Sequence, residues 1–230
     1  MAGTRERTKI FLVLILVWSV TLSAQDAVLR GKIVIEPKPK RADIAGAVVW
    51  LTYYDTRPAV QPGPMARLVQ KNKQFFPHLL AITVGTTVEF PNGDPFFHDV
   101  FSIYHGRPFD LGLYESGAAR KVVFTKPGVS YIFCNIHPEM NAVVVVLETP
   151  YFAQTDSDGS FQIAHLMPGR YKLELWHELA STSELSSLSR DIDVASGDNN
   201  LAVITLHSAN AGTQHLNKYG EPYSADKTSY

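Results

Sequence analysis

The 230-residue chain has little that would support several common protein classes. It contains one cysteine, Cys134, so no disulfide can form within the chain and a disulfide scaffold is excluded. It has no excess of basic residues, with 21 Lys and Arg against 22 Asp and Glu, which excludes a strongly basic nucleic-acid binder. Glycine and proline, 15 and 14 residues, are too few for a collagen-like or low-complexity chain. What the chain does have is 45% hydrophobic residues, enough for a core, so disorder is excluded.

The N-terminus has the pattern of a targeting segment. Three basic residues within the first nine positions precede a short apolar run at 10–22, and small residues follow up to Ala24. This pattern predicts a signal peptide over residues 1–24. The alternative, an uncleaved anchor, is disfavoured because the run is shorter than the roughly 20 residues of a membrane span. We therefore expect a periplasmic or secreted bacterial protein with no membrane span after cleavage.

Almost every periodic segment is typical of a β-strand, and no convincing helical period is present, so the predicted class is all-β. Turn-forming residues at 91–95, 126–128 and 156–159 separate the strands. The expected strands are 32–35, 47–52, 84–90, 122–124, 131–134, 142–147, 161–163, 171–176 and 201–206. Three polar stretches are expected to be loops, the last of them a flexible tail: 56–64, 181–189 and 209–230.

The residues most suited to chemistry follow two of these strands. Cys134, His137 and Met140 lie within seven residues, and His98 lies just after the turn that ends strand 84–90. A thiolate, two imidazoles and a thioether form the ligand set of blue-copper centres, whereas a thioether adds little to a zinc site. Each residue alone would be ordinary, but the only thiol of an exported chain needs protection from oxidation. The set predicts a site for one Cu(I)/Cu(II) ion.

Residues 67–148 resemble the plastocyanin, pseudoazurin and amicyanin group of cupredoxins. The resemblance is carried by Phe76-Pro77, residues 84–88 and 92–94, His98, Pro127-Gly128 and the loop Cys134-x-x-His137-x-x-Met140, which is as short as in amicyanin and pseudoazurin. It implies a Greek-key β-sandwich with copper near one end. It also implies that His98, Cys134, His137 and Met140 bind the metal and that His137 lies near the surface and carries the electrons.

Residues beside the ligands also take roles from this resemblance. Asp99 stands where asparagine is usual; with Asn135 it is expected to brace the cysteine loop, and its carboxylate would lower the reduction potential. Phe96, Phe97 and Pro138 are expected to form an apolar rim around His137, suited to brief contacts with a redox partner.

The flanking segments resemble a second family. Residues 155–161 and 166–173 are similar to the transthyretin-type sandwich of carboxypeptidase regulatory-like domains, and residues 29–34 and 45–51 resemble its first strands. We therefore expect a discontinuous domain, 27–56 plus 149–208, with a cupredoxin domain at 61–148 inserted in it or adjacent to it.

The expected function is that of a periplasmic electron carrier whose partner is a redox protein, either a dehydrogenase or a cytochrome. An enzyme is disfavoured because multicopper oxidases need paired His-x-His motifs, which this chain lacks, and a binuclear copper site needs a second cysteine, whereas the chain has one. The alternative is a copper-binding or scaffold module of a larger periplasmic assembly without independent carrier activity. The chain also resembles secreted proteins associated with bacterial methylamine utilisation.

Overall fold

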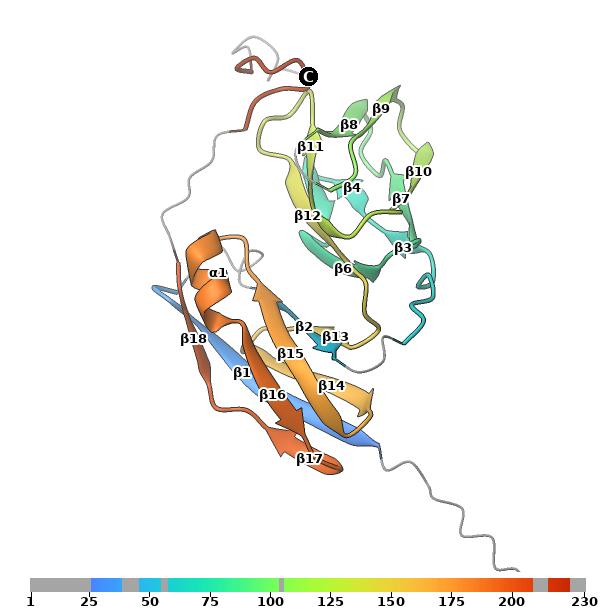
Figure 1. Cartoon of the computed structure of the whole chain (residues 1–230). Coiled ribbons are helices and arrows are strands. Elements are labelled where there is room, and N and C mark those ends of the chain that lie inside the picture. The colour runs from blue at the N-terminus through green and yellow to red at the C-terminus, as the bar shows by residue number, and fades with distance from the viewer. Residues whose placement is uncertain (1–25, 39–45, 55–57, 104–105, 209–214, 224–230) are drawn as a thin grey trace, which may run out of the picture.

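The computed structural model describes residues 26–38, 46–54, 58–103, 106–208 and 215–223 (Figure 1). These residues form eighteen β-strands and one short helix. The all-β prediction is therefore confirmed. The expected signal peptide, residues 1–24, lies outside the described residues. Within the described parts of the chain, no helix has the length and apolar character needed to cross a membrane.

One β-sandwich combines strands from the two ends of the described chain (Figure 1). In its first sheet β1 lies between β14 and β17 and also pairs with β18; the bounds are β1 (Ala27–Glu36), β14 (Ser160–Leu166), β17 (Gly197–Asn200) and β18 (Ile204–His207). Its second sheet has the order β13 (Phe152–Gln154), β2 (Val48–Tyr53), β15 (Gly169–Trp176) and β16 (Arg190–Val194). The antiparallel pairs β1–β14 and β2–β15 join strands from either side of residues 58–148.

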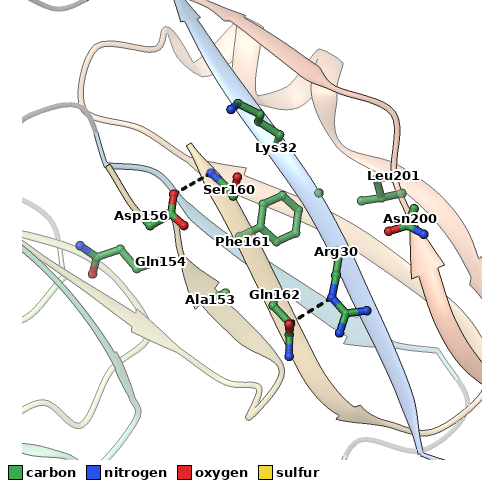
Figure 2. Close-up of a pocket in the computed structure, with 11 residues that line it drawn as sticks. Arg30, Lys32, Ala153, Gln154, Asp156, Ser160, Phe161, Gln162, Asn200 and Leu201 are labelled. Atoms are coloured by element: carbon green, nitrogen blue, oxygen red, sulfur yellow. Dashed lines mark hydrogen bonds between the residues drawn. The ribbon is translucent and has the colours of Figure 1, made fainter. Parts of the chain in front are cut away.

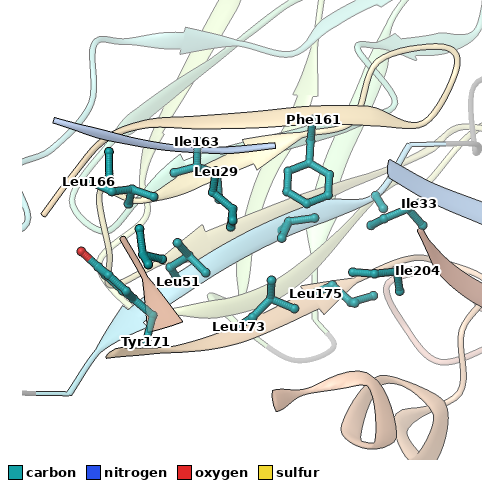
Figure 3. Packing of buried hydrophobic residues seen from close by; sticks show 14 of the residues in the cluster. Leu29, Ile33, Leu51, Phe161, Ile163, Leu166, Tyr171, Leu173, Leu175 and Ile204 are labelled. Atoms are coloured by element: carbon teal, nitrogen blue, oxygen red, sulfur yellow. The ribbon is translucent and has the colours of Figure 1, made fainter. Parts of the chain in front are cut away.

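Period-two alternation explains the core of this sandwich. In β15, Tyr171, Leu173 and Leu175 are buried while the residues between them are not, because successive side chains of a strand point to opposite faces. Figure 3 shows these residues meeting Leu29 and Leu51 between the two sheets. Burying such side chains contributes roughly 1.5–3 kcal/mol each, so this layer is a main source of the sandwich's stability.

The second sandwich is formed by the chain between these two halves. Its larger sheet has the order β6 (Leu79–Thr83), β12 (Asn141–Leu147), β11 (Gly128–Cys134), β8 (His98–Ser102) and β9 (Phe109–Tyr114). Opposite it lie β10 (Ala119–Val123), β7 (Thr87–Pro91) and β3 (Ala66–Arg67), and β4 (Val69–Lys71) forms a hairpin with β5 (Gln74–Phe76). Leu68, Phe90, Phe124 and Ile132 are among the residues that fill its core.

Strand β12 is buried on both faces, which explains its unbroken run of apolar residues. Val144 and Val146 point into the core of their own sandwich. Val143 and Val145 belong to a separate cluster with Val48 of the first sandwich. A strand covered on both sides needs apolar side chains at consecutive positions, so the run reflects packing between the two sandwiches.

Two expected loops differ from the structure. Residues 181–189, expected as a loop, contain helix α1 (Thr182–Leu188), whose N-cap Ser181 accepts a hydrogen bond from the backbone N–H of Glu184 at 3.1 Å. No residue of this helix is fully buried, and only Leu185 and Leu188 pack against the core, so its clearest signal is the capping pair of Ser181 and Glu184. Residues 215–223, expected within a flexible tail at 209–230, instead contact the end of the second sandwich that holds the β11–β12 loop (Figure 1). Aromatic and polar groups make these contacts, and apolar periodicity does not reveal them.

Candidate metal centre

Two paired strands bring the candidate ligands together. His98 is the first residue of β8 and Cys134 is the last residue of β11. These strands are antiparallel neighbours, with Cys134 opposite Val100. His137 and Met140 lie in the short loop that leads from β11 to β12. The sheet thus places His98 beside a loop that begins 36 residues later in the chain.

The three strongest ligand candidates converge on one buried point. The Nδ1 atoms of His98 and His137 each lie 3.6 Å from Sγ of Cys134. One ligand atom from each of the three residues lies within 4.8 Å of the others. His98 and Cys134 are fully buried, and His137 exposes only 6% of its surface. The resemblance implies that His137 lies near the surface; its ring packs against that of Phe96, 5.5 Å away between centroids.

These separations fit a bound metal ion. For an ion about 2.0 Å from nitrogen and about 2.3 Å from sulfur, with ~110–120° between the bonds, the nitrogen and sulfur lie about 3.6 Å apart. Both Nδ1–Sγ distances have this value. Two imidazoles and a thiolate suit copper or zinc, and a methionine in the same loop favours copper.

Backbone hydrogen bonds close the loop around these ligands. The N–H of Met140 donates to the carbonyl of His137 at 3.0 Å, and the N–H of Cys134 donates to the carbonyl of Met140 at 3.2 Å. Met140 is fully buried in the same hydrophobic cluster as Cys134. The loop therefore fixes the backbone positions of three candidate ligands relative to one another.

Burial sets the protonation of the ligands before a metal binds. Burial raises the pKa of the Cys134 thiol, although backbone N–H groups of Asp99, Ile136 and His137 oppose this change. Burial also lowers the pKa of His98, and with the neighbouring His98 it lowers the pKa of His137 to about 4. At neutral pH both imidazoles are thus uncharged and can bind a metal ion through nitrogen, whereas metal binding displaces the proton of the thiol.

Asp94 belongs to the site, although the sequence indicated only that this residue is part of a turn. Its buried carboxylate lies 2.9 Å from Nε2 of His98. It also accepts hydrogen bonds from the backbone N–H groups of Asn72 at 2.6 Å and Lys73 at 3.0 Å. Burial raises the pKa of Asp94, but these three partners outweigh it and lower the pKa overall. A carboxylate on Nε2 leaves Nδ1 of His98 free to bind a metal.

Asp99 and Asn135 contact each other as expected. The side-chain amide of Asn135 donates to Oδ2 of Asp99 at 3.2 Å, and its backbone N–H donates to the Asp99 carbonyl at 2.8 Å. The same Oδ2 atom lies 2.8 Å from Nζ of Lys218, a partner that sequence reasoning did not foresee. Lys218 thus pairs with the carboxylate that is expected to lower the reduction potential, and that expectation stays a prediction.

The three expected rim residues differ in their surroundings. The half-buried Phe96 packs against both His98 and His137, with centroid distances of 5.4 and 5.5 Å. Phe97 is 51% exposed. Pro138 is half-buried, and its carbonyl lies 2.6 Å from Nε2 of His215. Only Phe97 is thus a largely exposed member of this set.

The other sandwich has a shallow groove that is lined by residues of the paired strands β1 and β14 and their neighbours (Figure 2). Its basic residues already have partners: Arg30 donates to Gln162 at 3.1 Å and pairs with Asp198, and Lys32 pairs with Asp158 at 3.0 Å. Because these charges are paired, we assign the groove no ligand.

No protein-family model matches the chain, and neither does any curated protein. Among solved structures, a purple cupredoxin from Nitrosopumilus maritimus is 28% identical and covers 36% of this chain and 99% of its own, with a TM-score of 0.33. A copper-containing nitrite reductase from Thermus scotoductus SA-01 is 29% identical with a TM-score of 0.35; the match covers 50% of this chain and 28% of that enzyme. A Cu(I) amicyanin variant is 20% identical with a TM-score of 0.34, covering 40% of this chain and 97% of its own. The structural neighbours of this chain thus include cupredoxins, over part of its length.

Proposed function

We propose that the protein is a type 1 copper protein that carries single electrons in the bacterial periplasm. The observation that carries this proposal is the buried convergence of His98, Cys134 and His137, with both Nδ1–Sγ distances at 3.6 Å. Met140, at the end of the same loop, supplies the thioether that distinguishes a copper set from a zinc set. When bound, copper supplies reversible one-electron chemistry.

The chain's own residues favour fast electron transfer by holding the ligands still. Asp94 orients the imidazole of His98 through Nε2. The two backbone hydrogen bonds between Cys134, His137 and Met140 close the loop independently of any metal. Ligands held in this way need little rearrangement when the charge at the site changes, which lowers the barrier to electron exchange.

The surface around His137 supports exchange with another protein. Phe96 contacts the His137 ring, and the neighbouring Phe97 is exposed, so an exposed apolar side chain lies close to a candidate ligand. A small apolar contact suits a weak and short-lived redox complex. We expect the partner to be a periplasmic dehydrogenase or cytochrome.

Electrochemistry tests this function directly. The copper-loaded protein should bind one copper per chain and show a reversible one-electron wave. His98→Asn should abolish this wave, whereas His165→Asn, which replaces an exposed histidine of the other sandwich, should leave it unchanged. Copper binding without a reversible wave would instead support the alternative of a copper-holding or scaffold module, and stoichiometric zinc in preference to copper would contradict the proposal.

A further inference from the structure

Residues 215–223, which we name the C-terminal strap, make contacts at three places with residues 134–141, which we name the copper loop because they include three of the candidate copper ligands. His215 stacks on Phe133 at 4.0 Å between centroids and lies 2.6 Å from the carbonyl of Pro138 through Nε2. Tyr223 donates its hydroxyl proton to the carbonyl of Cys134 at 2.9 Å. The strap therefore bonds to the backbone of a candidate ligand and to the loop that follows it.

Lys218 makes the third contact and lies at the centre of the strap. Its backbone N–H donates to Oδ1 of Asn135 at 3.1 Å. Its ammonium lies 2.8 Å from Oδ2 of Asp99 and 3.0 Å from Oδ2 of Asp110. Asn135 is thus held from both sides, because its amide nitrogen donates to Asp99 while its oxygen accepts from Lys218.

The burial of this ion pair distinguishes it from an incidental surface contact. The side chains of Lys218 and Asp99 are only 13% and 8% exposed. An exposed pair contributes little, but a buried carboxylate that loses its only cation is strongly destabilised. Burial lowers the pKa of Lys218, yet the two carboxylates outweigh it and raise the pKa, so the ammonium stays charged.

We propose that the C-terminal strap is a positioning element of the copper loop and that Lys218 is the residue through which it compensates the charge of Asp99. The link to reduction potential rests on the proposed copper function, whereas the anchoring of residues 134–141 does not. Lys218 follows Met140 by 78 residues in the sequence, so the loop is completed by a part of the chain outside both sandwiches.

Hydrogen exchange of the metal-free protein tests the anchoring. Lys218→Met should increase exchange of the backbone amides of residues 134–141 about tenfold or more, because a charge-assisted bond is lost. Tyr223→Phe, which removes only a hydroxyl, should have a smaller effect at the same amides. Lys218→Arg should retain most of the protection, and Lys126→Met, at an exposed lysine of the same sandwich, should change nothing. Unchanged exchange in both Lys218→Met and Tyr223→Phe would overturn the anchoring role.

The reduction potential of the copper-loaded protein tests the charge compensation. Lys218→Met should lower the potential, because the unpaired carboxylate of Asp99 favours Cu(II), and Asp99→Asn should raise it. The double variant, which removes both opposite charges of the pair, should return close to the wild-type value. A potential that does not respond to Lys218→Met would overturn this role.

The two experiments separate the strap from the copper function. If the wild-type protein shows no copper–thiolate signature, the function fails while the exchange data still decide the anchoring. If the signature is present and neither exchange nor potential responds to the variants, the strap proposal fails and the function stands.

Discussion

Replacing Asp94 should weaken the fold and change the metal centre together. Its carboxylate accepts three hydrogen bonds, from Nε2 of His98 and from the N–H groups of Asn72 and Lys73. Asn72 and Lys73 both have φ of 55°, in a turn that such N–H contacts stabilise. Asp94→Ala removes all three hydrogen bonds, and with about 1–2 kcal/mol for each donor left unsatisfied, we expect a loss of about 3–6 kcal/mol. Asp94→Asn keeps one oxygen and should cost about 2–3 kcal/mol.

Urea denaturation of the metal-free protein, followed by circular dichroism, measures these losses. Asp193→Asn, at an exposed position, is the control and should stay within about 0.5 kcal/mol of the wild type. In the copper-loaded protein, Asp94→Asn should keep the intense visible band but raise the reduction potential, because His98 loses its anionic partner. Wild-type stability together with a wild-type potential in Asp94→Asn would refute the role given to this carboxylate.

Three further variants test other parts of the structure. Gly159→Ala should lower the free energy of unfolding in urea by about 3 kcal/mol or more, because φ is +86° and the new Cβ would lie 2.1 Å from the Ile33 carbonyl oxygen. The control Gly197→Ala, with φ of +84° and open space around the new Cβ, should cost only about 1–2 kcal/mol. Equal losses in the two variants would contradict this account. Met140→Leu should keep the visible band and raise the potential, since the thioether that Met140 would supply to copper is lost; an unchanged potential would remove Met140 from the ligand set. Pro138→Lys should slow electron self-exchange about tenfold or more at low salt, measured by NMR line broadening, while Met167→Lys on the other sandwich should not; no slowing would exclude Pro138 from the exchange surface.

Much of the strand pattern could be predicted from sequence because packing leaves a local signal. The valine run of β12 is visible because both faces of that strand are buried. Strand β9 (Phe109–Tyr114) was missed because only Tyr114 is buried in it. Helix α1 was missed because only Leu185 and Leu188 of its seven residues are apolar, too few to establish a period. Burial alone does not make an element visible, because β8 was also missed although all five of its residues are buried.

Local spacing in the sequence revealed part of the candidate site. Cys134, His137 and Met140 could be recognised as a set because they lie within one short loop. The role of Asp94 depends on a turn at 72–73 that only the fold brings to it. Lys218 lies far from the loop in sequence and has no spacing that marks it. Contacts made through the tertiary structure therefore account for what sequence reasoning missed.

The visible absorption spectrum of the copper-loaded protein, recorded with its electron paramagnetic resonance spectrum, tests the central claim most directly. A buried site formed by Cys134, His98 and His137 predicts an intense thiolate-to-copper band and a narrow copper hyperfine splitting, both lost in Cys134→Ser. A colourless protein that binds zinc stoichiometrically, or a band that persists in Cys134→Ser, would contradict the account.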